Sequence, residues 1–419
     1  MNVLSYNKRK FLPYLPLYLI FLSNVVISIR DYEEIETSPV SLGVIHKIIS
    51  LIVAFCFIFV YILYNKKLTI KLPLPLKLYL YYLMLGFFSL SQAQIVGYSI
   101  WKLFEVVTTF IFAIYIIVSS AKQPKVGILW YEKTLRIILI IVLLALVGLI
   151  INPTKALAPP TSKGEAFLNY QLNGYIINTN PNSLGLLASI LLMVSICRLY
   201  LFNNRKNYWL TIFLLSFFVM VLSQSRTSWM AFAVSLATFI ILSQTKIQYK
   251  IFSIIVIILV IYFFTNPLLL YLQRGSSESL IMSGSGRVDM WIFAWDIIKE
   301  HKITGLGFGE GSRAILSIYG AGTTSTLHSD YLDAAASVGI LGPILIFCIF
   351  LTSLFYILRN YQLIKLSYPK NYWIELLLII LMLWVRSLTG ITISSLSYFC
   401  IIFFIVIAVA YIGIQGENS

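Results

Sequence analysis

Long apolar runs recur along the whole chain and constrain its fold more than any other feature. Each run has roughly 17 to 25 residues, the length that a helix needs to cross the hydrocarbon core of a bilayer. Hydrophobic residues make up 59% of the 419 residues and charged residues only 11%. The sequence therefore predicts one all-α, polytopic integral membrane domain over 1–419. About twelve spans are expected, at 11–29, 42–64, 78–96, 100–118, 135–152, 183–202, 207–224, 227–244, 250–272, 332–358, 372–388 and 392–412.

Charged residues alternate regularly between these spans. When the N-terminus is placed on the cytoplasmic side, every inner loop is basic, whereas the first outer segment, 31–36, is acidic. Basic loops are retained on the cytoplasmic side of membranes. The pattern predicts that both termini are cytoplasmic. The net charge of +15 is then explained mostly by the basic loops that fix the membrane topology. Membrane lipid is thus an expected partner and nucleic acid is not.

The longest polar segment, about 266–330, lies between the ninth and tenth spans and is predicted to be a large periplasmic loop. Within it, residues 287–301 show apolar side chains at three- and four-residue steps, with charged residues on the opposite face. This spacing predicts an amphipathic helix. Trp291 and Trp295 suit the headgroup level, so the helix is expected to lie along the outer membrane surface.

Three arginines outside the inner loops are candidates for binding an anion. Arg226 lies in a very short polar turn between two spans, Arg287 opens the amphipathic helix, and Arg386 is at the outer end of the eleventh span. A guanidinium stays charged and can form two hydrogen bonds to phosphate oxygens at once. The alternatives are a snorkelling anchor for Arg226 and a solvated surface residue for Arg287.

His328 lies at the outer mouth of the tenth span, just before Asp330 and Asp333. A histidine there can accept a proton near neutral pH, although a lone histidine is more often a structural hydrogen-bonding residue. The two acids either stabilise a helix start or orient His328.

Asn180 and Asn182 open the sixth span. Their amides can bind sugar hydroxyls, and helix capping is the alternative. No paired His/Cys spacing and no nucleotide motif occurs, so neither a metal nor a cofactor is expected.

Several short motifs occur together over about 178–343. They are NSLG at 182–185, SRTSW at 225–229, SGRVDMW at 285–291, GLGFG at 305–309, and HSDYL at 328–332 with GILG at 339–342. In this order and spacing the sequence resembles the O-antigen ligase and polysaccharide polymerase family of bacterial envelopes. Ser329 departs from the asparagine that many members have at this position.

The resemblance implies a membrane glycosyltransferase of O-antigen, lipopolysaccharide or capsule biosynthesis in the bacterial inner membrane. Such an enzyme takes a glycan from undecaprenyl diphosphate at the periplasmic face and joins it to an acceptor. By position in the motifs, Arg226 and Arg287 would hold the diphosphate and His328 would assist the acceptor hydroxyl as catalytic residues. The residues expected to bind substrate are Arg386, Asp330, Tyr331, Asn180 and Asn182.

The chemistry of these side chains fits such a transfer. Displacing a diphosphate from an anomeric carbon needs neutralisation of charge, which two arginines can supply without a metal. The acceptor hydroxyl then approaches the face opposite the leaving group and inverts the anomeric centre.

Several other functions are compatible with the same pattern. The acceptor can be a lipid-linked repeat unit, as for a polymerase, the lipid A core, as for a ligase, or a protein, as for an O-oligosaccharyltransferase. A transporter or flippase of lipid-linked sugars is the alternative outside enzymes, because the number of spans and the basic inner loops suit it equally.

Overall fold

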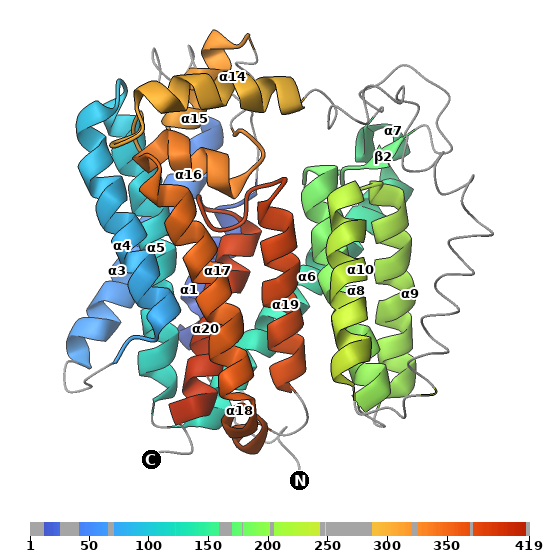
Figure 1. Cartoon of the computed structure of the whole chain (residues 1–419). Coiled ribbons are helices and arrows are strands. Elements are labelled where there is room, and N and C mark those ends of the chain that lie inside the picture. The colour runs from blue at the N-terminus through green and yellow to red at the C-terminus, as the bar shows by residue number, and fades with distance from the viewer. Residues whose placement is uncertain are drawn as a thin grey trace.

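The computed structural model describes residues 12–25, 42–65, 71–121, 123–158, 170–177, 179–201, 205–243, 248, 287–320, 326–368 and 372–415. Within these ranges the chain is almost entirely helical (Figure 1). The helices of the first half are η2 (Leu12–Tyr14), α1 (Leu15–Leu22), α3 (Leu42–Tyr64), α4 (Leu74–Ser89), η3 (Leu90–Gln92), α5 (Val96–Ser120), α6 (Pro124–Ile151), α7 (Pro153–Ala156) and α8 (Pro181–Leu201). Those of the second half are α9 (Lys206–Ser223), α10 (Arg226–Leu242), α14 (Arg287–Glu300), α15 (Gly311–Ile318), α16 (Asp330–Val338), α17 (Leu341–Arg359), α18 (Tyr361–Ser367), α19 (Tyr372–Ser387) and α20 (Tyr398–Gln415). One antiparallel pair joins β1 (Leu157–Ala158) to β2 (Gln171–Leu172), with Leu157 opposite Leu172.

Eight helices in the described part of the chain are long and apolar enough to cross a membrane. A bilayer offers no water to backbone N–H and C=O groups, so a span must satisfy them internally, as a helix does. The prediction of an all-α, polytopic membrane protein is confirmed. The eight are Val44–Tyr64, Leu74–Gln92, Val96–Ser120, Lys125–Ile151, Pro181–Tyr200, Lys206–Ser223, Leu341–Arg359 and Tyr398–Gln415, and the shorter α10 is also apolar.

The structure extends the predicted fifth span, 135–152, back to Pro124 in α6, and it divides the predicted tenth span. The expected helix over 332–358 is divided at Gly339 into α16 and α17. Gly339 has φ +79°, and a Cβ atom there would lie 2.5 Å from the carbonyl oxygen of Ile303, so only glycine fits the break. The last helix begins at Tyr398 rather than near 392. The predicted span 250–272 and residues 266–286 and 321–325 of the predicted loop lie outside the described residues.

The helices form a main bundle with a three-helix unit at its side (Figure 1). Helix α20 lies in the centre, where it contacts α1, α5, α6 and α19 and is buried along nearly its whole length. Helices α8, α9 and α10 pack on one another and join the main bundle through α19 and α6. The contact of α10 with α19 brings the start of one helix beside the end of the other.

A buried ion cluster fastens the three-helix unit to the bundle. Arg198 of α8 donates to both carboxylate oxygens of Glu375 in α19, at 2.9 Å each, and lies 2.8 Å from a carboxylate oxygen of Glu132 in α6. The hydroxyl of Tyr131 donates to Glu375 and that of Tyr372 to Glu132. Buried charges need such complete pairing to be tolerated.

The two ends of the bundle carry different short helices. Lys125, Arg359 and Lys365 lie at the end where α6 begins and α17 ends, drawn at the bottom of Figure 1. Helix α14 lies across the opposite end, above α15 and α16 (Figure 1). These three short helices have an apolar core of their own, formed by Met290, Ala294, Ile298, Ile315, Leu316, Leu327, Ala335 and Ala336.

Candidate functional site

Three arginine side chains from three helices meet at the end of the bundle that α14 covers. Arg226 is the first residue of α10, Arg287 is the first of α14, and Arg386 is in the last turn of α19. The Nη1 atoms of Arg287 and Arg386 both donate to the carbonyl oxygen of Thr389, at 3.1 and 3.4 Å. Burial, and then repulsion from Arg226, lower the pKa of Arg287. The three positive charges therefore act within one small region.

The turn after α19 holds these arginines together. The hydroxyl of Thr389 lies 2.9 Å from that of Thr227, the neighbour of Arg226. Gly390 lies against the guanidinium of Arg386, because a Cβ atom built on it would be 2.2 Å from Cζ of Arg386. Thr389 and Gly390 were not predicted from the sequence. Their signal in the sequence is weak: they belong to a short polar segment that follows Arg386.

We expect Gly390→Ala to displace the guanidinium of Arg386 without unfolding the protein. The added methyl group meets the flexible end of a side chain, which moves more easily than a packed backbone. If Arg386 binds substrate, a displacement of about 1 Å lowers the transfer rate by up to roughly 100-fold. The rate per membrane-inserted protein measures this effect. Gly97→Ala is the matched control, since a Cβ atom there meets nothing within 4 Å. A wild-type rate for Gly390→Ala contradicts the prediction.

His328 lies in the same region as the arginines. Burial lowers the pKa of His328 to about 4, and the charges of Arg287 and Arg386 act in the same direction. The imidazole is thus neutral at pH 7 and able to accept a proton. Its φ of +56° is a left-handed conformation that is unusual for a residue other than glycine. Such conformations persist where the surrounding structure imposes them, and they cluster at functional sites.

Asp330, which the sequence predicts to bind substrate, is fully buried and bonded to the protein itself. Its carboxylate accepts hydrogen bonds from the backbone N–H groups of Thr392, Ile393 and Ser394, at 3.0 to 3.2 Å. The hydroxyls of Thr392 and Ser394 also donate to it. These bonds fix the segment 392–394 in a non-helical conformation and explain why α20 starts only at Tyr398.

The other predicted substrate-binding residues occupy two places. Tyr331 is in the first turn of α16, and its hydroxyl accepts a hydrogen bond from the indole of Trp384 at 2.9 Å. Asn180 caps the start of α8, with its side-chain oxygen 2.9 Å from the backbone nitrogen of Asn182. The carbonyl of Asn182 accepts from Ser228, so the start of α8 is tied to the turn that carries Arg226.

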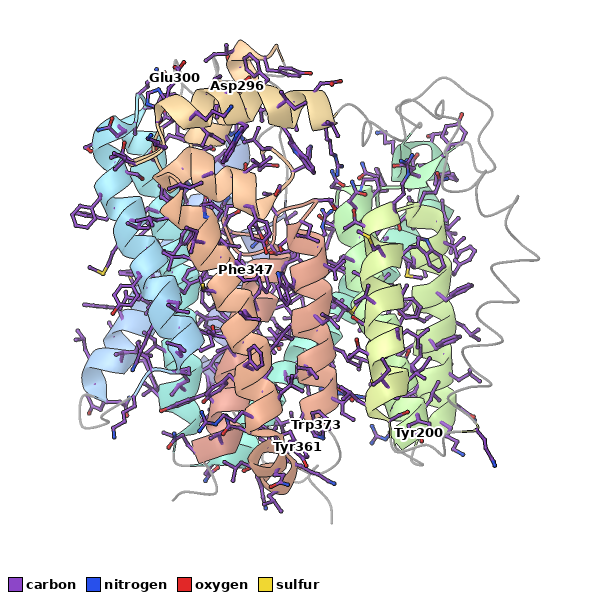
Figure 2. All side chains as sticks on the ribbon, in the orientation of Figure 1. Tyr200, Asp296, Glu300, Phe347, Tyr361 and Trp373 are labelled. Atoms are coloured by element: carbon purple, nitrogen blue, oxygen red, sulfur yellow. The ribbon has the colours of Figure 1, made fainter. Side chains whose placement is uncertain are left out.

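An apolar groove lies between α14 and α16 and continues to α17. Its upper part, about 520 Å³, is lined by α14 residues including Val288, Trp291 and Trp295, and by Ser329 and Leu332 next to the histidine. Its lower part, about 420 Å³, continues from Trp295 and Leu332 to Ile344 and Phe347 on α17. Figure 2 shows Asp296 and Glu300 on α14 and Phe347 farther down the bundle. The groove therefore runs from the first turn of α14, which begins at Arg287, to the exposed apolar residues of α17.

The family comparison matches the part of the chain that carries this site. Residues 211–347 match the family described as O-antigen ligase. This match supports membership of the O-antigen ligase and polymerase family. The matched segment includes Arg226, Arg287 and His328, whereas Arg386, Asn180 and Asn182 lie outside it. Comparison with curated proteins finds no match.

The family match indicates the general role of the protein. It is a multi-pass inner-membrane protein with ligase- or glycosyltransferase-type activity in polysaccharide assembly. Its substrates are, in general terms, a lipid-linked glycan and an acceptor. Among the residues that the structure describes, no group of three His, Cys, Asp or Glu side chains is arranged to hold a metal ion.

Proposed function

We propose that this O-antigen ligase family member transfers a glycan from undecaprenyl diphosphate to an acceptor hydroxyl at the periplasmic face of the inner membrane. Both termini are then cytoplasmic. The acceptor is the glycan of a lipid-linked repeat unit, for a polymerase, or of the lipid A core, for a ligase. The reaction inverts the anomeric centre and needs no metal.

The observation that carries this proposal is the convergence of Arg226, Arg287 and Arg386 beside a neutral His328. Guanidinium groups from three helices can surround a diphosphate and neutralise the charge that develops as it leaves. The cluster lies at the end of the bundle opposite Lys125, Arg359 and Lys365. Because basic loops mark the cytoplasmic side, this position supports a periplasmic site.

The apolar groove supports a lipid-linked donor. It starts at Val288 and Ser329, the residues that follow Arg287 and His328, and it reaches Ile344 and Phe347 of α17, which are both exposed. A polyprenyl chain is apolar and anchored in the bilayer, whereas its diphosphate is anionic. The groove and the arginines therefore suit the two parts of one molecule.

The chemical step follows from this arrangement. The acceptor oxygen forms a bond to the anomeric carbon on the face opposite the leaving group, and the bond from that carbon to the diphosphate oxygen breaks. The electron pair of the broken bond stays with the diphosphate, where the arginines stabilise it. The proton of the acceptor hydroxyl passes to the imidazole of His328. His328 then releases the proton to water.

In our proposal Asp330 does not touch the substrate. Its carboxylate accepts hydrogen bonds from the segment 392–394 and holds that segment in place. Tyr331 lines the apolar groove and is placed to contact the donor lipid. Asn180, with its exposed side chain, and Asn182 lie beside the turn of Arg226, where sugar hydroxyls can reach them.

Glycan transfer is expected to continue in the presence of EDTA. The arginines supply the positive charge that a divalent metal supplies in other phosphate-transfer sites. Transfer is measured in washed membranes with and without the chelator. Complete loss of activity that added magnesium restores would contradict the metal-independent mechanism.

The rate of transfer is expected to stay constant between about pH 5.5 and 8 as far as it depends on His328, because the imidazole does not change its protonation state in this range. Since burial lowers the pKa of His328 to about 4, the basic form is already complete in this range. The unfolded chain binds a proton near pH 6.5 that the folded chain does not bind until about pH 4. Stability therefore rises with pH across that window. A pH–rate profile of folded protein tests the prediction, and a fall centred near pH 6.5 contradicts it.

Deletion of the gene tests the proposed function and identifies the acceptor. Single repeat units on the lipid carrier are expected to accumulate if the protein is a polymerase, and unlinked long chains if it is a ligase. Unmodified protein acceptor would indicate an O-oligosaccharyltransferase instead. If the lipid-linked glycan accumulates only on the cytoplasmic face, the protein is a flippase and the proposal fails.

A further inference from the structure

The residue before His328 is held at three points. The backbone N–H of Leu327 donates to a carboxylate oxygen of Asp333, at 2.9 Å. Its carbonyl accepts a hydrogen bond of 2.7 Å from the indole nitrogen of Trp291. Its side chain is fully buried in the small apolar core of α14, α15 and α16. Leu327 therefore has little freedom to rotate or shift.

The carboxylate of Asp333 is itself fixed from a third helix. Ser312 of α15 donates its hydroxyl proton to the oxygen that also receives the Leu327 N–H. The backbone N–H of Asp333 donates to the carbonyl of Ser329, at 2.9 Å. His328 is thus enclosed between two residues, Leu327 and Ser329, that are both bonded to Asp333.

Trp291 links these contacts of Leu327 to the arginine cluster. It lies four residues after Arg287 in α14, and residues at this spacing lie on the same face of a helix. Arg287 donates to Thr389, while Trp291 donates to Leu327. One helix face therefore sets both the position of a phosphate-binding group and the position of the histidine.

We propose that Trp291 and Asp333 are positioning residues, which clamp the Leu327 peptide so that His328 is held in its left-handed conformation at a fixed place relative to Arg287. This inference rests on the proposed function, because it concerns the approach of the acceptor hydroxyl to the donor that the arginines hold. The clamp matters because transfer needs the base, the acceptor oxygen and the anomeric carbon in line.

Trp291→Phe removes the indole N–H and keeps an aromatic ring in the same place. The carbonyl of Leu327 then loses its partner, and His328 gains freedom relative to Arg287. We expect kcat to fall about 10- to 100-fold, with the KM for the donor changed by no more than about twofold, because the arginines and the groove still bind it. The donor used is the lipid-linked glycan extracted from the deletion strain.

Trp373→Phe is the matched control. It makes the same chemical change at the opposite end of the bundle, where the indole nitrogen of Trp373 has no hydrogen-bond partner. Its kcat is expected to equal that of the wild type. A loss of kcat in Trp373→Phe equal to that in Trp291→Phe would show a general effect of tryptophan replacement and overturn the inference.

Replacing Asp333 tests the hydrogen bond at the N–H group of Leu327. Asp333→Asn keeps an oxygen that can accept the Leu327 N–H, whereas Asp333→Ala removes it. We expect Asp333→Asn to retain most of the wild-type kcat and Asp333→Ala to lose at least about 10-fold, with both present in the membrane. This pair decides the inference even if Trp291→Phe inserts poorly.

The two proposals fail in different ways. Wild-type kcat in both Trp291→Phe and Asp333→Ala, with His328→Ala inactive, overturns the clamp and leaves the proposed function intact. Wild-type kcat in His328→Ala overturns the proposed role of the histidine itself, and the positioning inference with it.

Discussion

Replacing His328 by alanine is expected to lower glycan transfer by at least about 100-fold, the usual contribution of a positioned general base. In the proposed mechanism, the neutral imidazole near Arg287 and Arg386 takes the proton of the acceptor hydroxyl. Alanine leaves no proton acceptor at this position. The rate of transfer in membranes with equal amounts of inserted protein measures the effect, and gels of cell-surface polysaccharide give the same result in cells.

His301→Ala is the control for this prediction. His301 follows α14 at the same end of the bundle, so its replacement makes the same chemical change without touching the arginine cluster. Polysaccharide of normal length is expected from this strain. Normal long-chain polysaccharide from a His328→Ala strain would rule out the proposed role of His328.

Replacing Arg226 or Arg287 by alanine is expected to lower transfer by about 100- to 1,000-fold each, the range found when a group that stabilises developing charge is removed. Both side chains contribute to a site with three positive charges, and a leaving diphosphate needs that charge. Lysine at either position keeps the charge but loses the planar, two-pronged donor geometry. The lysine variants are therefore expected to fall between alanine and the wild type.

Lys302→Ala is the matched control for the arginines. Lys302 is exposed at the same end of the molecule, so its replacement removes one positive charge outside the cluster. Transfer by this variant is expected at the wild-type rate. If Arg287→Ala and Lys302→Ala lose activity equally, the effect arises from net charge at the membrane surface, and the diphosphate assignment is wrong.

The all-α membrane fold was predictable from the sequence because its signal is local. A membrane span is recognised in the sequence as a continuous apolar run. The span predicted at 42–64, for example, corresponds to α3 at Leu42–Tyr64. The eleventh predicted span, 372–388, corresponds equally closely to α19 at Tyr372–Ser387. Helix α14 occupies Arg287–Glu300, where the three- and four-residue spacing indicated an amphipathic helix. Each of these signals lies within one segment of the chain.

The break between α16 and α17 was not predictable in the same way. The run 332–358 is apolar almost throughout, so its composition favours one continuous span. The break at Gly339 depends on the carbonyl groups of Lys302 and Ile303, which approach it from a distant part of the chain. The late start of α20 similarly depends on Asp330, 62 residues before Thr392.

The sequence alone determined that this chain forms membrane-spanning helices, and its motifs singled out Arg226, Arg287 and His328. Apolar length and helical periodicity are properties of consecutive residues, so they can be recognised without a structure. Only the tertiary structure brought Arg226, Arg287 and Arg386 around Thr389 and tied Trp291 and Asp333 to Leu327. Those contacts join residues on different helices, and they depend on how α10, α14, α16 and α19 pack together, which no single segment specifies.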